Sequence, residues 1–188
     1  MAHTGYVPEV TPQRPEQVVT SRKRPSGLNA VLRRLVHTRE DALPFVLRIT
    51  LALVMFPHGA QKLLGWFGGL GFDGTIGAMR SGLGLPPWVT VLIMITEFFG
   101  SIALLLGLLT RVAALGIAAL MVGAIALVHA QHGFFMDWYG AQQGEGFEYH
   151  LLALGSALAL MMGGGGALSV DHAFQTRELT PSSAHGRD

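Results

Sequence analysis

Long apolar stretches separated by short polar segments make up most of the chain after residue 42. Four of them stand out, at about residues 43–64, 88–110, 112–131 and 147–163. A helix needs about 20 mostly apolar residues to cross the hydrocarbon core of a bilayer. The pattern therefore predicts an all-α membrane protein with four transmembrane helices. Because short connections make sequential helices neighbours, we expect an antiparallel four-helix bundle over residues 43–168.

The segments outside these stretches differ in composition. Residues 1–27 are polar and proline-rich and end in a basic run, which predicts a disordered basic arm. Residues 28–40 place apolar side chains on one stripe and arginines off it. This pattern is typical of an amphipathic helix that lies on an anionic membrane surface or packs on the protein's own loops. Residues 65–87 hold eight glycines and predict a tight loop over the bundle, and residues 169–188 predict a polar tail.

The charges are few and unevenly distributed. Charged residues make up 13% of the chain, against about 25% in a typical soluble domain. Seven of the 13 lysines and arginines precede residue 40, whereas residues 133–146 contain none. By the positive-inside rule, both termini are therefore expected in the cytoplasm. The basic run near residue 24 marks the cytoplasmic side of a membrane segment, so we expect no nucleic-acid partner.

One carboxylate lies deep in an apolar helix and needs a partner. Glu97 follows Trp88, the first residue of the second stretch, by nine positions. A charge near the centre of a bilayer costs about 2.5–3.5 kcal/mol even on lenient scales, so it should face protein. His58 and Lys62 are four residues apart and share a helical face. We expect Lys62 and Glu97 to form a buried pair.

The antiparallel topology brings more polar residues to the same depth. The sequence predicts a polar pocket in the outer half of the bundle, formed by His58, Lys62, Glu97, His129, Glu148 and His150. Such a cluster could bind a polar head group and exchange protons with it. The alternative is purely structural: these residues satisfy one another or extend to the interface, and fix the helix register.

Metal and haem sites are further alternatives, because histidines and carboxylates at one level can ligate either. However, no Glu-x-x-His or His-x-x-x-His pair falls within one predicted helix, and the haem reading rests on two histidines of separate helices. We therefore predict no metal site. The chain has no cysteine, which excludes disulfides, thiolate metal sites and Fe–S clusters on it. We expect no covalently bound cofactor. A redox role would therefore need a non-covalently bound cofactor, such as a quinone, or a partner protein.

Several motifs match one known family. They are His-Gly-Ala-Gln-Lys-Leu at 58–63, Gly-Leu-Pro at 84–86, Glu-Tyr-His-Leu-Leu at 148–152, and a Glu-Phe-Phe-Gly segment at 97–100 that continues into Thr110-Arg111. Over about residues 43–174 the sequence resembles the DoxX family of small bacterial membrane proteins. The resemblance implies a four-helix bundle in the bacterial inner membrane and an association with membrane redox processes. By position, the matching residues are Gly59, Lys62, Glu97, Arg111 and Glu148.

These observations lead to a main hypothesis and a rival of a different class. The main one is a membrane component of an oxidoreductase system that binds a quinone-like head group and works with a soluble or membrane redox subunit. The rival is a non-catalytic membrane partner that recruits or stabilises a soluble enzyme through residues 1–42. A small transporter or proton pathway is a third reading. Small residues four apart, such as Ala119 and Gly123, let helices approach closely and are compatible with a homo-oligomer.

Overall fold

The computed structural model describes residues 42–179, with side chains to residue 176. The basic arm and the amphipathic helix predicted before residue 41 lie outside this range. Every regular element within the range is helical. The longer ones are α2 (Ala42–Leu64), α3 (Gly71–Leu83), α4 (Pro87–Leu106), α5 (Thr110–Ala124), α6 (Glu148–Gly163) and α7 (Val170–Leu179). Three short segments complete them: η1 (Trp66–Gly68), the π-helical η2 (Ile125–His129) and η3 (Ala130–His132).

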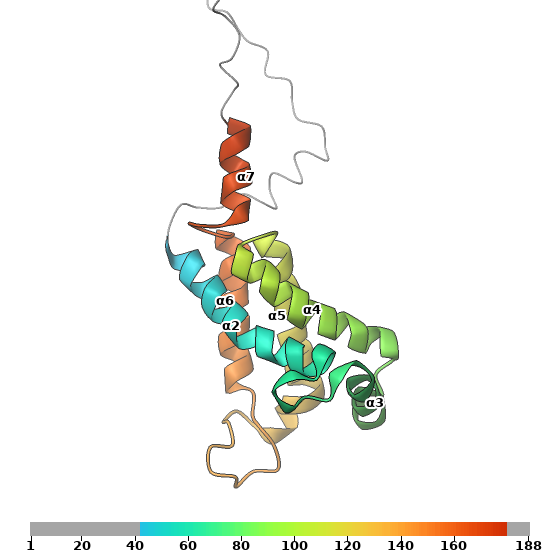
Figure 1. Ribbon diagram of the computed structural model, residues 1–188. Helices are drawn as coiled ribbons and strands as arrows, with labels where there is room; N and C mark the ends of the chain where they lie inside the picture. The colour runs from blue at the N-terminus through green and yellow to red at the C-terminus, as the bar shows by residue number, and fades with distance from the viewer. Residues whose placement is uncertain (1–41, 180–188) are drawn as a thin grey trace, which may run out of the picture.

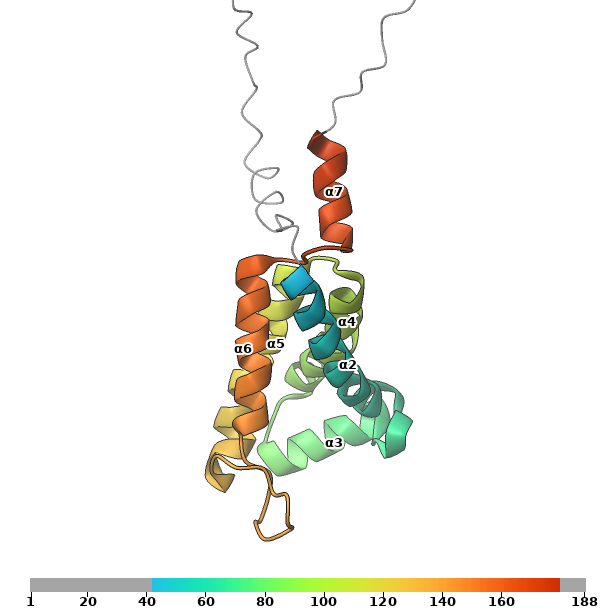
Figure 2. The same cartoon turned by 90° about the vertical axis from the view of Figure 1, so that its left-hand side faces the viewer.

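Four of these helices pack side by side around a common core. Helix α2 packs against α4 and α6, and α5 packs against α4 and α6. The core contains Leu51, Leu104, Ile117 and Leu160, one from each helix. Helix α7 stands at one end of this arrangement, and α3 lies across the opposite end (Figures 1 and 2). We refer to these as the α7 end and the α3 end.

Three helical segments in the described range are long and apolar enough to cross a membrane: Ala42–Leu64, Pro87–Leu106 and Thr110–His132. They correspond to the first three stretches that the sequence predicts. Helix α6, in the fourth stretch, has 16 residues. It is shorter because it begins at Glu148, after the polar segment that follows η3, and ends at Gly163, where a run of four glycines starts.

Part of the glycine-rich segment is helical, so the expectation of a loop is wrong over residues 71–83. Asp73 lies in the first turn of α3 and Arg80 in its last turn, which suits the helix dipole. Gly84 adopts a left-handed conformation (φ 67°) and ends the helix. Thr75 is buried and anchors α3 to α2, because its hydroxyl donates to the carbonyl of Lys62 at 3.0 Å.

The α7 end is closed by a buried arginine. Arg48, near the start of α2, is 1% exposed, and its guanidinium donates hydrogen bonds to five backbone carbonyls. Two belong to the last turn of α4 and three to the segment between α6 and α7: Leu104, Leu105, Gly165, Ala167 and Leu168. Asp171 of α7 accepts from the backbone N–H groups of Leu109 and Thr110, and thereby caps α5.

Part of the predicted polar tail is therefore a helix, α7. The first turn of α7 is attached to the turn between α4 and α5 and to the start of α5. The backbone N–H of Asp171 donates to the carbonyl of Gly107 at 2.9 Å, in addition to the two bonds that its carboxylate accepts. Gly107 lies in the turn between α4 and α5 with φ 66°, and a Cβ there would lie 3.1 Å from the Cζ atom of Arg48. Through these contacts α7 is held at the turn that connects α4 and α5.

Candidate functional site

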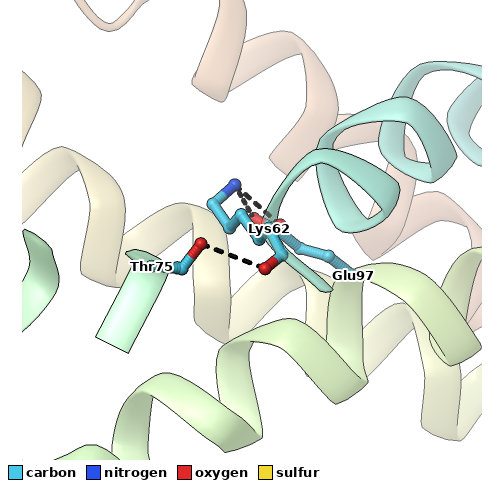
Figure 3. Close-up of polar contacts among 3 residues, drawn as sticks. All are labelled: Lys62, Thr75 and Glu97. Carbon is cyan, nitrogen blue, oxygen red and sulfur yellow. Dashed lines mark hydrogen bonds and ion pairs between the residues drawn. The ribbon is translucent and has the colours of Figure 1, made fainter. Parts of the chain in front are cut away.

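An ion pair joins α2 and α4 towards the α3 end. The Nζ atom of Lys62 lies 3.0 Å from Oε1 and 2.7 Å from Oε2 of Glu97 (Figure 3). The side chain of Glu97 is 5% exposed and that of Lys62 is 24% exposed. The pair expected from the sequence is therefore present. It lies in the last turn of α2 and near the middle of α4.

Close backbone packing allows the two charged residues to meet. A Cβ atom at Gly59 would lie 2.5 Å from the backbone nitrogen of Phe98 and 2.8 Å from the carbonyl carbon of Glu97. Only glycine permits this approach of α2 to α4 without a shift of one helix. Next to it, the rings of Phe56 and Phe98 pack with their centroids 5.3 Å apart. Gly59 therefore sets the distance between the two helices at the ion pair.

Two histidines stack where η2 meets the start of α6. The ring centroids of His129 and His150 are 3.9 Å apart, with 37° between the ring planes. The Nδ1 atom of His129 lies 2.8 Å from the carbonyl oxygen of Glu145. His129 is the last residue of the π-helical segment η2. Such segments are rare and are frequent at functional sites. In this chain the segment ends at the histidine that stacks on α6.

A cavity of about 990 Å³ connects these groups. Lys62, Glu97, His58, His129 and His150 all line it, so five of the six residues predicted for the polar pocket border one space. The remaining wall is mostly apolar and comes largely from α3, α4, α5 and η2, with further residues from α2, α6 and the segment before α6. It includes Met79, Leu83, Leu92, Ile93 and Leu127. The cavity is thus apolar over most of its surface and polar near α2 and α6.

The remaining sequence-predicted residues lie elsewhere. Glu148 does not line the cavity, and its carboxylate accepts from the backbone N–H of Met136 at 2.9 Å and from the indole of Trp138 at 3.3 Å. Arg111, in the first turn of α5, donates to the carbonyl of Met161 near the end of α6. It therefore belongs to the α7 end. In the part of the chain that the structure describes, no three His, Asp or Glu side chains are placed to hold a metal ion.

The six predicted pocket residues did not include several residues that line the cavity. Tyr149 lines the cavity beside His150, and Met79 and Leu83 reach it from α3. The residues of α3 were missed because the glycine content of this segment argued against a helix. The π-helical segment carries no sequence signal that would have revealed it. The position of Tyr149 between two site candidates at 148 and 150 was the available signal for that residue.

Comparison with known proteins agrees with the resemblance found in the sequence. A sequence model of the DoxX family matches residues 43–130. The chain is also 30% identical over 115 residues to the "Putative oxidoreductase CatD" of Bacillus subtilis (strain 168), a match covering 61% of this chain and 75% of that protein. The chain belongs to the DoxX family. No solved structure matches it significantly.

The DoxX match includes the ion pair and most of the cavity wall. Residues 43–130 cover α2 from its second residue, α3 to α5 and η2, and therefore hold Lys62, Glu97 and His129. His150 and the rest of α6 follow the matched range. Within the described residues, three helical segments are suited to crossing a bilayer, and this DoxX protein is therefore a multi-pass membrane protein.

Proposed function

We propose that this DoxX protein is the membrane component of an oxidoreductase system and binds a quinone-like head group in the cavity. The observation that carries the proposal is the Lys62–Glu97 pair, which borders a cavity with mostly apolar walls. Removing two charges from water is costly, and ionisable residues within membrane segments usually mark functional sites. A lipid-soluble ligand with a small polar head has the chemistry that such a cavity accommodates.

The polar side chains suit the head group of a quinone. An ammonium group has three N–H donors. Two contacts of Lys62 go to the oxygens of Glu97, which leaves a third donor for a ligand carbonyl. His58 lies one turn before Lys62 on α2 and lines the same space. Hydrogen bonds from these two residues would hold a carbonyl oxygen of the ligand near the ion pair.

Proton exchange is the second task that the cavity could support. Reduction of a quinone to a quinol consumes two electrons and two protons. Imidazole is the side chain best suited to proton transfer near neutral pH. His129 and His150 are stacked on each other and line the cavity. We propose that this pair carries protons between the head group and the surface at the α3 end.

The electrons would come from a partner. The chain has no cysteine and so carries no thiol or Fe–S centre. We therefore propose a soluble or membrane redox subunit that passes two electrons to the bound head group. The similarity to a protein named as a putative oxidoreductase supports a redox role. That partner would complete the reaction for which this chain supplies the binding site and protons.

We also propose that α6 is a fourth crossing, with both termini in the cytoplasm of a bacterial cell. The 16 residues of α6 span about 24 Å at about 1.5 Å per residue, somewhat less than the roughly 30 Å hydrocarbon core. Arg48 and Arg111 lie at the α7 end, and residues 133–146 at the other end contain no Lys or Arg. The positive-inside rule then places the cavity in the outer half of the bilayer.

Titration of purified protein with decylubiquinone in detergent tests the binding proposal. Glu97→Gln removes the charge that holds Lys62 in place, and Asp73→Asn, on the exposed face of α3, is the matched control. A hydrogen bond to a charged group contributes about 1.5–3 kcal/mol, so we expect Glu97→Gln to weaken binding by about 10- to 100-fold. Unchanged affinity in a variant that keeps its helical circular dichroism and its elution volume would refute the head-group site.

A further inference from the structure

The cavity lies in a wedge between α4 and α5. The two helices are joined by the tight turn at the α7 end, where the N–H of Leu108 donates to the carbonyl of Ala103. They still touch at Gly116, where a Cβ would lie 3.0 Å from Cγ2 of Thr96. Both Gly116 and Thr96 border the cavity. From this contact towards the α3 end, the facing side chains of α4 and α5 line the open space.

The small residues of α5 border this space and do not form a packed seam within the chain. Ala119 is exposed, and a Cβ at Gly123 would meet no atom within 4 Å. Both residues line the cavity. The interpretation of this pair as a helix–helix contact therefore does not hold inside the described chain. The small side chains instead widen the cavity along α5 into a smooth channel.

The rim of the cavity is apolar and open. Leu92 on α4 and Leu127 on η2 both line the cavity and are each 57% exposed. Leu83 on α3 also lines it and is exposed. In a multi-pass membrane protein, exposed leucines on spanning helices face lipid chains rather than water. The opening between α4 and α5 thus leads sideways into the bilayer.

We infer that the ligand enters laterally from the bilayer, between α4 and α5, and is an amphiphile with a small polar head and a linear apolar tail. The head lies at Lys62 and His58, and the tail lies along Ala119 and Gly123 towards the rim. The identity of the head as a quinone rests on the function proposed above. The path and the amphiphilic character rest on the cavity walls alone.

Steric fit, rather than hydrophobic gain, should control the tail. Lipid chains are as apolar as leucine side chains, so moving a tail from the bilayer into the cavity gains little free energy. Lengthening the tail would therefore change affinity little, whereas blocking the channel would reduce it. Gly123→Leu places a side chain in the open space beside α5. Gly155→Leu is the matched control, because Gly155 is an exposed glycine of α6 with no atom within 4 Å of its Cβ position and does not line the cavity.

Because the chain has no cysteine, a single introduced thiol can be labelled specifically. Leu127→Cys places a fluorophore at the rim, and Leu152→Cys places one on an exposed position of α6 outside the cavity. The full-length labelled proteins are reconstituted in phosphatidylcholine vesicles and titrated with decylubiquinone, which quenches the fluorophore. We expect saturable quenching at the rim and a linear, collisional response at the control position.

In the Leu127→Cys background, Gly123→Leu should raise the half-saturating concentration about tenfold, as expected for an overfilled site. Gly155→Leu should leave the concentration unchanged. If Gly123→Leu has no effect while Glu97→Gln still weakens binding, the lateral path is wrong and the head-group site stands. A third outcome is saturable quenching by a fatty acid that carries a doxyl group on its chain, but not by decylubiquinone. If Gly123→Leu abolishes this quenching, the lateral path stands and the quinone function is wrong. Linear quenching by both compounds at both positions would overturn the inference.

Discussion

The buried guanidinium of Arg48 permits a quantitative stability prediction. Each of its five N–H groups is directed at a carbonyl: one on Nε, two on Nη1 and two on Nη2. The shortest donor–acceptor distance is 2.5 Å, to the carbonyl of Leu168, and the longest is 3.3 Å, to the carbonyl of Ala167. The last carbonyls of a helix have no partner within the helix. Arg48 donates to two of these carbonyls at the end of α4, and the carbonyl of Leu104 also accepts from the N–H of Gly107.

Arg48→Lys keeps the charge and reduces the number of donors. An ammonium group has three N–H groups, so at least two of the five bonds are lost. At about 1.5 kcal/mol or more for each hydrogen bond to a charged group, the substitution should lower the free energy of unfolding by about 3 kcal/mol. Arg48→Met removes the charge as well and leaves all five carbonyls without this partner, so we expect a larger loss.

Unfolding of the purified protein by SDS in mixed micelles, followed by circular dichroism, measures this loss. Arg80→Lys is the control, because Arg80 is exposed on α3. The midpoint of Arg48→Lys should fall well below those of the wild type and of Arg80→Lys. Equal midpoints for Arg48→Lys and Arg80→Lys would show that the five contacts contribute no net stability, and would refute the reasoning.

Three further substitutions test packing and topology. Gly59→Ala puts a Cβ 2.5 Å from the backbone of Phe98. The free energy of unfolding in SDS should therefore fall by about 1–3 kcal/mol, and ligand titration should show a weaker affinity. Gly100→Ala is the control and should show neither effect, because no atom lies within 4 Å of its Cβ position. Gly107→Ala, at φ 66° and 2.4 Å from the Cβ of a buried serine, should destabilise by at least about 1 kcal/mol in the same assay. Tyr139→Cys, 95% exposed, should react with a membrane-impermeant maleimide in intact cells; labelling only after permeabilisation would contradict the proposed orientation.

The helices and the ion pair could be predicted because strong single effects determine them. Apolar length alone indicates the three spanning segments. The cost of an unpaired carboxylate at the depth of Glu97 demands a partner, and Lys62 had the right position on the preceding helix. Both predictions depend on the bilayer as a solvent, which acts on every residue of a segment. Local irregularities do not weaken such signals.

Features that depend on tertiary contacts could not be predicted in this way. Five glycines, at positions 71, 74, 77, 82 and 84, lie in or beside α3 and lower its helix propensity. The helix nevertheless forms, anchored through Thr75 to the end of α2. The cavity could not be predicted from the sequence either, because it also depends on tertiary contacts. Ala119 and Gly123 fit a packed helix contact equally well, and only the divergence of α4 from α5 shows that they face open space.

The two ends of the molecule use their cations differently, so substitutions at the two ends should differ in their effect on ligand affinity. All five donors of Arg48 are engaged by backbone carbonyls, so this residue has no donor left for a ligand. Lys62 uses two contacts on Glu97 and borders a cavity. Arg48 substitutions should therefore shift the unfolding midpoint and leave the affinity of the folded fraction unchanged. Substitutions at Lys62 should lower both the ligand affinity and the unfolding midpoint, because they also leave the buried carboxylate of Glu97 without its partner.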